Sequence, residues 1–417
     1  MFQEDMMRTR YVILGVLFLG WVVSYLDRMV MTVAIPYIAQ DFNLSPVEVG
    51  AVISAFFFGY AIFQLPGGLL ADKFGPRKVM VGGITWWTFF AVLTGFANSM
   101  SPMLAIRALF GIGEGVYPAS SWKMIANWFP VKERSTANGI MMSSNFFGPA
   151  IAPLFVVAIM ASWGWRAVFY CLLIPGVIMV FLLYKYCTDS PGTHPTVSKE
   201  EVALINEDSP TPTAANDIKK VTFRQALSSS IVWKCFIVWF FFDITFWGFM
   251  SWVPSYLVNE RGYEMVKMGI TASIPFFAGT AGLIFGGWFA DKYCPNNRPL
   301  YVSVSNLLAG ISVFCTYHAS AEMVLPVMSI AGFLIAVAFA SIWGLPMTVL
   351  PKEVMGSATG FINIAGQIAG FIAPLLLGFL IQTTGTYYSA FMVLAGSPIV
   401  AAVLSLFIKK SDKLRTA

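Results

Sequence analysis

Residues 67–73 of the chain read GGLLADK, and residues 286–292 read GGWFADK. Five of the seven positions are identical, at an offset of 219 residues. A second match lies farther along the chain, where Pro153 corresponds to Pro374 at an offset of 221. Two matches at nearly the same offset indicate an internal duplication, in which one structural unit occurs twice.

Each copy of the repeat closes a long apolar segment, and such segments fill most of the chain. Hydrophobic residues make up 57% of the 417 positions and charged residues 11%, whereas a soluble domain carries about 25% charged residues. A helix needs about 20 apolar residues to cross a bilayer, and the sequence offers twelve such windows. They fall at 12–38, 48–71, 79–98, 102–126, 136–160, 166–186, 230–257, 266–290, 300–319, 323–348, 357–381 and 386–409. Because lipid cannot satisfy open backbone, each window is predicted to be a helix.

One long polar segment divides the windows into two groups of six. It carries four prolines and mixed charges, as expected of a linker. The predicted fold class is therefore an all-α polytopic membrane protein, with a six-helix bundle at 1–186, a cytoplasmic central loop at 187–229 and a second bundle at 230–417. Two parallel six-helix halves are typical of alternating-access carriers, whose binding site lies at the midplane between the halves.

The positive charges predict the orientation of the chain in the membrane. Of the 26 Lys and Arg residues, 21 flank the windows on the side of both termini and the central loop. Arg166, Arg261 and Lys267 fall on the other side, and Arg28 and Arg107 lie inside windows. The positive-inside rule then places both termini and the central loop in the cytoplasm. The basic balance is explained by the lipid bilayer, so no nucleic-acid partner is expected.

Several segments resemble a known transporter family. The segment 68–78, GLLADKFGPRK, resembles the loop signature of the major facilitator superfamily. YLDR at 25–28, RALFGIGE at 107–114 and DSP at 189–191 resemble its anion:cation symporter branch. That branch includes bacterial proton-coupled carriers for galactonate, glucarate and hexuronates. The resemblance implies a multi-pass protein of a bacterial inner membrane, driven by a proton gradient and without a cofactor.

Five ionisable residues fall well inside the apolar windows, namely Asp27, Arg28, Arg107, Glu114 and Asp243. Each costs about 2.5–3.5 kcal/mol at the bilayer centre, so the set implies a gross cost on the order of 15 kcal/mol. Mutual pairing offsets part of that cost. A purely structural role explains one ion pair poorly and five charges worse, so we interpret the first four as functional.

Arg107 and Glu114 are seven residues apart, which is two helical turns, so they share a helix face. A guanidinium offers a planar fork that suits a carboxylate, and the resemblance makes Arg107 the substrate clamp. The resemblance also implies that Glu114 is the proton-coupling acid and Asp27 a second titrating group. Arg28 is then a charge-balancing or gating partner within the substrate site.

Five polar side chains complete the predicted substrate site. Tyr25, Tyr60 and Asn145 match substrate-binding positions of the sugar-acid carriers by motif and spacing. Asn363 and Gln367 are one turn apart in the eleventh window, where they could hydrogen-bond substrate hydroxyls from the second half. For each of these residues the alternative is a hydrogen bond between helices, and for Tyr60 it is aromatic packing.

Asp243 departs from the pattern of the branch. It lies in the aromatic run 239–247, WFFFDITFW, at the depth of Tyr25 when Pro254 is aligned with Pro36. Two interpretations stay open. Asp243 is either a third acid near the cavity, which contacts an amine or hydroxyl or adds a titration, or a neutral acid hydrogen-bonded within the helix bundle.

Asp72 and Asp291 close the second and eighth windows, in a basic setting that includes Arg77 and Lys78. Carboxylates at such places can face helix N-termini and basic side chains. We expect these residues to latch a cytoplasmic gate in the outward-open state.

These observations favour a monomeric secondary carrier that imports a small organic anion, such as a sugar acid or other carboxylate, together with protons. The chain has no G-x-x-x-x-G-K-[ST] loop, metal-ligand spacing or assembled nucleophile, so an enzyme or ATP-driven pump is not expected. The nearest alternative is a proton-antiporting exporter of amphipathic compounds, which shares the fold and would suit the aromatic run around Asp243. A receptor or sensor would need a signalling domain, for which the short termini leave no room.

Overall fold

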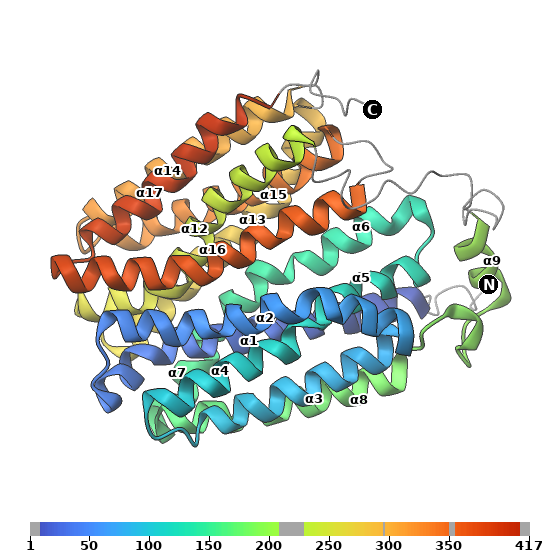
Figure 1. The fold of residues 1–417 in the computed structure, drawn as a ribbon, viewed down its shortest axis with the longest axis horizontal. Helices are drawn as coiled ribbons and strands as arrows, with labels where there is room; N and C mark the ends of the chain where they lie inside the picture. The colour runs from blue at the N-terminus through green and yellow to red at the C-terminus, as the bar shows by residue number, and fades with distance from the viewer. Residues whose placement is uncertain (1–8, 208–228, 295–296, 350–354, 409–417) are drawn as a thin grey trace.

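The computed structural model describes residues 9–207, 229–294, 297–349 and 355–408, and these are almost entirely helical (Figure 1). The first group of helices comprises α1 (Thr9–Phe42), α2 (Pro46–Phe74), α3 (Pro76–Thr94), α4 (Met100–Gly115), α5 (Tyr117–Trp128), α6 (Val131–Met142), α7 (Ser144–Cys171) and α8 (Leu173–Tyr186). The second comprises α12 (Ser230–Asn259), α13 (Met265–Tyr293), α14 (Arg298–His318), α15 (Val324–Val349), α16 (Met355–Thr384) and α17 (Tyr388–Ser405). These two groups are called the first half and the second half below.

The helices confirm the expected twelve-span architecture. By length and composition, nine helical segments within the described residues could cross a membrane. One of them, Val131–Tyr186, contains two expected spans, and α3 together with the α4–α5 pair accounts for the remaining two. The predicted boundaries of the halves stay a prediction, because the central loop lies partly outside the described residues. Its described part holds the short helices η1 (Pro191–Thr193) and α9 (Lys199–Glu207).

Local sequence explains where these helices begin and bend. α2 starts with a capping box, in which the Ser45 side chain and Glu48 satisfy each other's backbone N–H groups, and Pro46 occupies the first helical position. The fifth and sixth expected spans meet at Gly164, which has a φ of 75° inside α7. Only glycine adopts that conformation at little cost, so the chain turns there between two spans.

The two halves approach each other closely at the end away from both chain termini. In Figure 1 the left-hand ends of α2 and α16 lie near each other, and the two helices separate toward the side of N and C. The Ser54 hydroxyl on α2 donates a hydrogen bond of 2.7 Å to the Phe371 carbonyl on α16. At Gly50 an added Cβ would lie 2.4 Å from the Pro374 carbonyl oxygen. Direct backbone packing of this kind closes that end of the molecule.

Candidate functional site

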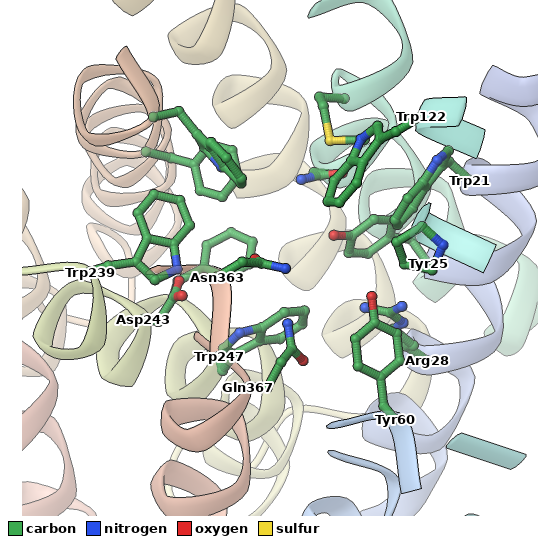
Figure 2. A pocket seen from close by; sticks show the side chains of 16 residues that line it. Trp21, Tyr25, Arg28, Tyr60, Trp122, Trp239, Asp243, Trp247, Asn363 and Gln367 are labelled. Carbon is green, nitrogen blue, oxygen red and sulfur yellow. The ribbon is translucent and has the colours of Figure 1, made fainter. Parts of the chain in front are cut away.

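A cavity of about 480 Å³, including space open to solvent, lies between the two halves (Figure 2). Helices α1, α2, α5, α6 and α7 of the first half line it together with α12, α15 and α16 of the second. The lining residues are Trp21, Tyr25, Arg28, Tyr60, Pro118, Trp122, Met142, Asn145, Trp239, Asp243, Phe246, Trp247, Phe339, Trp343, Asn363 and Gln367. The structure thus brings together Arg28, the five polar residues predicted for the substrate site, and Asp243.

Arg28 is the charged centre of the first-half wall. Its Nε donates a hydrogen bond of 2.6 Å to the Glu114 carboxylate, which also accepts one of 3.0 Å from the Ser24 hydroxyl. The guanidinium lies over the rings of Tyr25 and Tyr60, each 4.8 Å from its centre. Its Nη2 atom has no hydrogen-bond partner among the described residues. A fixed guanidinium with a free donor beside a cavity is suited to binding a carboxylate.

Arg107 does not line this cavity. It is 2% exposed and borders a second space of about 320 Å³, which Arg28 and Trp247 also border. Its guanidinium lies 4.4 Å from the Phe110 ring centre. We expected Arg107 to be the substrate clamp on the helix face that it shares with Glu114, but the ion pair of Glu114 is formed with Arg28. The clamp role of Arg107 stays a prediction, and in this arrangement Arg28 occupies the place that a clamp requires.

Asp27, the predicted second titrating group, directly precedes Arg28 in the sequence and is buried, but it is not among the cavity-lining residues. Its Oδ1 atom has no hydrogen-bond partner within the described part of the chain. Neither predicted proton-coupling acid lines the cavity itself, but Glu114 forms an ion pair with Arg28, which does.

The opposite wall carries Asp243 on α12 and the amides of Asn363 and Gln367 on α16, as Figure 2 shows. The Asp243 side chain is 3% exposed, and no residue in the described ranges donates a hydrogen bond to it. Gly366 provides room for this carboxyl, because a Cβ at that position would lie 2.2 Å from Oδ2. Of the two interpretations of Asp243, the geometry favours an acid that faces the cavity.

Several other polar atoms of the lining also have no hydrogen-bond partner among the described residues. They are Asn145 Oδ1, Trp239 Nε1, Trp343 Nε1 and Gln367 Oε1. Buried polar groups are normally hydrogen-bonded to protein or water, so these atoms fit a cavity that holds a polar ligand. In the chain as described, no cluster of His, Cys, Asp and Glu is arranged to hold a metal ion.

The aromatic side chains of the lining were not predicted as site residues, although a signal for them exists in the sequence. Trp239, Asp243 and Trp247 are each four residues apart, and so are Trp21 and Tyr25. Residues spaced by four share one helix face. Once Asp243 and Tyr25 are candidates, the same spacing predicts their tryptophan neighbours.

Three of the predicted gating residues, Asp72, Arg77 and Asp291, make contacts within their own halves. Asp72 pairs with Lys123 at 2.6 Å, and Asp291 pairs with Arg298 at the start of α14. The Arg77 side chain donates a hydrogen bond to a backbone carbonyl of α8. A latch in the outward-open state stays a prediction, because the arrangement described here is closed at the other end.

Comparison with known proteins identifies the family. Residues 17–374 match the sequence profile described as Major Facilitator Superfamily. The chain is 32% identical to the "Probable galactarate/D-glucarate transporter GarP" of Escherichia coli (strain K12), over 96% of this chain and 94% of that protein. It is 33% identical to the "Probable sulfoacetate transporter SauU" of Cupriavidus necator, over 97% of this chain and 95% of that protein. The "Hexuronate transporter" of Bacillus subtilis (strain 168) is 31% identical, over 93% and 92%.

Solved structures share the fold at low identity. A D-xylose-proton symporter superposes with a TM-score of 0.77 at 17% identity, covering 98% of this chain and 99% of that chain. A bacterial homologue of the human lysosomal transporter Spinster, in an inward-facing and unoccupied conformation, gives a TM-score of 0.76 at 19% identity, covering 96% and 95%.

Proposed function

The chain belongs to the Major Facilitator Superfamily and is a transporter rather than an enzyme, and from this premise we propose that it takes up a small organic anion together with protons. One observation carries the proposal. Arg28 lines a cavity between the halves and has a buried guanidinium nitrogen without a hydrogen-bond partner among the described residues, while its Nε is bonded to the carboxylate of Glu114. A substrate carboxylate and a protonatable acid therefore share one guanidinium.

Sharing of this kind links binding of the anion to binding of a proton. The substrate carboxylate at Arg28 brings a negative charge close to Glu114, and a proton on Glu114 removes the repulsion. Occupancy of one site thus favours occupancy of the other, and the linkage is reciprocal. In this proposal Glu114 keeps its predicted role as the proton-coupling acid, and Arg28 is the guanidinium that it shares with the substrate.

The cavity fits one state of an alternating-access cycle. It lies between the halves, and the molecule is closed at the end away from the termini. With the termini in the cytoplasm, as the charge distribution predicts, the cavity faces inward. The proposal places the protein as a monomer in a bacterial inner membrane.

The relatives suggest which anions to test. Their names include galactarate, glucarate, sulfoacetate and hexuronate, and all of these are small anions. In proteoliposomes with an imposed inward proton gradient, we expect accumulation of at least one carboxylate, and loss of that accumulation in Arg28→Ala. Absence of gradient-driven accumulation for all tested anions would overturn the proposal.

Proton-driven export of amphipathic compounds is the second candidate, and the aromatic lining with Asp243 is the observation that favours it. The same vesicle experiment separates the two functions. Vesicles that contain an importer accumulate substrate in response to an inward proton gradient, whereas vesicles that contain an antiporting exporter lose it.

A further inference from the structure

We propose that the carried anion is an aromatic carboxylate with an amino or hydroxyl group at the end of the ring remote from the carboxylate. The inference rests on the proposed function and specifies the substrate class. It follows from the two polar ends of the cavity, Arg28 and Asp243, and from the aromatic body between them.

The lining is mostly aromatic. Nine of its sixteen residues are Trp, Tyr or Phe. On the second-half side the rings pack against one another, with Trp239 and Trp343 centred 4.7 Å apart at an angle of 72°. Ring pairs in such offset or edge-on arrangements contribute about 0.5–1.5 kcal/mol beyond their buried area. A flat aromatic ligand can use these surfaces, because they offer ring faces and edges.

The same lining fits a polyhydroxylated chain poorly. Each hydroxyl that is buried without a partner costs about 1–3 kcal/mol. Apart from the aromatic side chains, the polar lining consists of Arg28, Asn145, Asp243, Asn363 and Gln367. A sugar acid carries a hydroxyl on each carbon between its ends, and several of these hydroxyls would face aromatic rings.

Asp243 determines which chemical group fits at the end of the ligand remote from Arg28. It lies on α12 of the second half, across the cavity from Arg28 on α1, as Figure 2 shows. No cation among the described residues pairs with it. An amino or hydroxyl group on the ligand would donate a hydrogen bond to this carboxyl. The cavity thus selects a ligand with one acidic end and one donor end.

The test compares four ligands by calorimetry on the purified full-length protein, namely 4-aminobenzoate, 4-hydroxybenzoate, benzoate and glucarate. We expect the amino and hydroxy compounds to bind at least tenfold more tightly than benzoate, and glucarate to bind more weakly than benzoate. Asp243→Asn should reduce the tenfold preference to about twofold. Gly366→Ala, which crowds the Asp243 carboxyl, should weaken the preference in the same direction.

Asp41→Asn is the matched control, because it makes the same chemical change at an exposed pair with Arg166 near the end of α1. It should leave all four affinities unchanged. Tight binding of glucarate without binding of the aromatic acids would overturn the substrate class and leave anion transport intact. A preference for the amino and hydroxy compounds that persists in both Asp243→Asn and Gly366→Ala would also overturn it. Failure of every carboxylate to bind would refute the proposed function as well.

Discussion

Replacing Glu114 by Gln is expected to strengthen anion binding and to remove its dependence on pH. Arg28 Nε lies 2.6 Å from the Glu114 carboxylate, and Nη2 is left for a ligand. Two carboxylates on neighbouring edges of one guanidinium lie about 6 Å apart, and at an effective dielectric constant of about 20 they repel by about 3 kcal/mol. That free energy corresponds to about a hundredfold in Kd.

The direction of the pH dependence follows from the charge on Glu114. At low pH a proton on Glu114 removes the repulsion, so the wild-type protein binds the anion tightly. As the pH rises and Glu114 ionises, the affinity falls by up to about a hundredfold. The Gln variant has no charge to gain and should keep the tight affinity throughout. Calorimetric titration at several pH values measures both curves.

Transport by the same variant tests the coupling directly. Counterflow between equal substrate pools needs only binding and reorientation, so Glu114→Gln should retain it. Uphill uptake under an imposed pH gradient needs a proton to be carried, so the variant should lose it. Glu133→Gln, which makes the same change in the partly exposed pair with Arg10, serves as the control. Proton-driven accumulation by Glu114→Gln would refute the reasoning and make Asp27 the leading candidate.

Four further expectations concern single substitutions. Arg28→Lys keeps the charge but loses the planar fork, so it should weaken anion binding at least tenfold in calorimetry. Arg107→Lys should reduce uptake sharply although the protein reaches the membrane in normal amounts. Near-normal uptake by this variant would remove Arg107 from the substrate path. Gly50→Ala places a Cβ against the Pro374 carbonyl, so it should destabilise the closed contact between α2 and α16 by about 1–3 kcal/mol. An engineered cysteine near this contact should then react faster with a thiol reagent added from outside. Asp72→Asn breaks an exposed ion pair with Lys123, so the free energy of unfolding should change by less than about 1 kcal/mol. Slower uptake by this variant at an unchanged substrate affinity would indicate that Asp72 takes part in gating.

The fold could be predicted because its determinants act along the sequence. Hydropathy reports how each segment partitions into lipid, and the repeated GGxxADK segment reports the duplication. The break between α4 and α5 at Val116 was not predicted, and neither was the way α7 runs through Gly164 into the next span. Both are local features of the backbone, which an average over a window of about 20 residues does not detect.

The composition of the site could be predicted more readily than its pairing. Helical spacing placed Arg107 and Glu114 on one face of α4, but it could not tell which neighbour each would meet. That choice depends on how closely the helices pack. An added Cβ at Gly111 would lie 2.1 Å from the Phe56 carbonyl, so α4 lies directly against α2. In the resulting arrangement Glu114 reaches Arg28 on α1, and Arg107 packs on aromatic rings.

Arg28 has a further position that links ligand binding to the transport cycle. It borders both the cavity and the second space, and so does Trp247. Arg28 belongs to the first half and Trp247 to the second, and the Trp247 ring packs on Phe57 of the first half with centres 4.8 Å apart. The Arg28 guanidinium lies 5.9 Å from the centre of the Trp247 ring, so a route from the cavity to the second space would pass between these two side chains. In the proposed cycle the guanidinium that binds the anion is therefore also part of the barrier, and a change in its partners from Glu114 to the ligand alters the barrier itself.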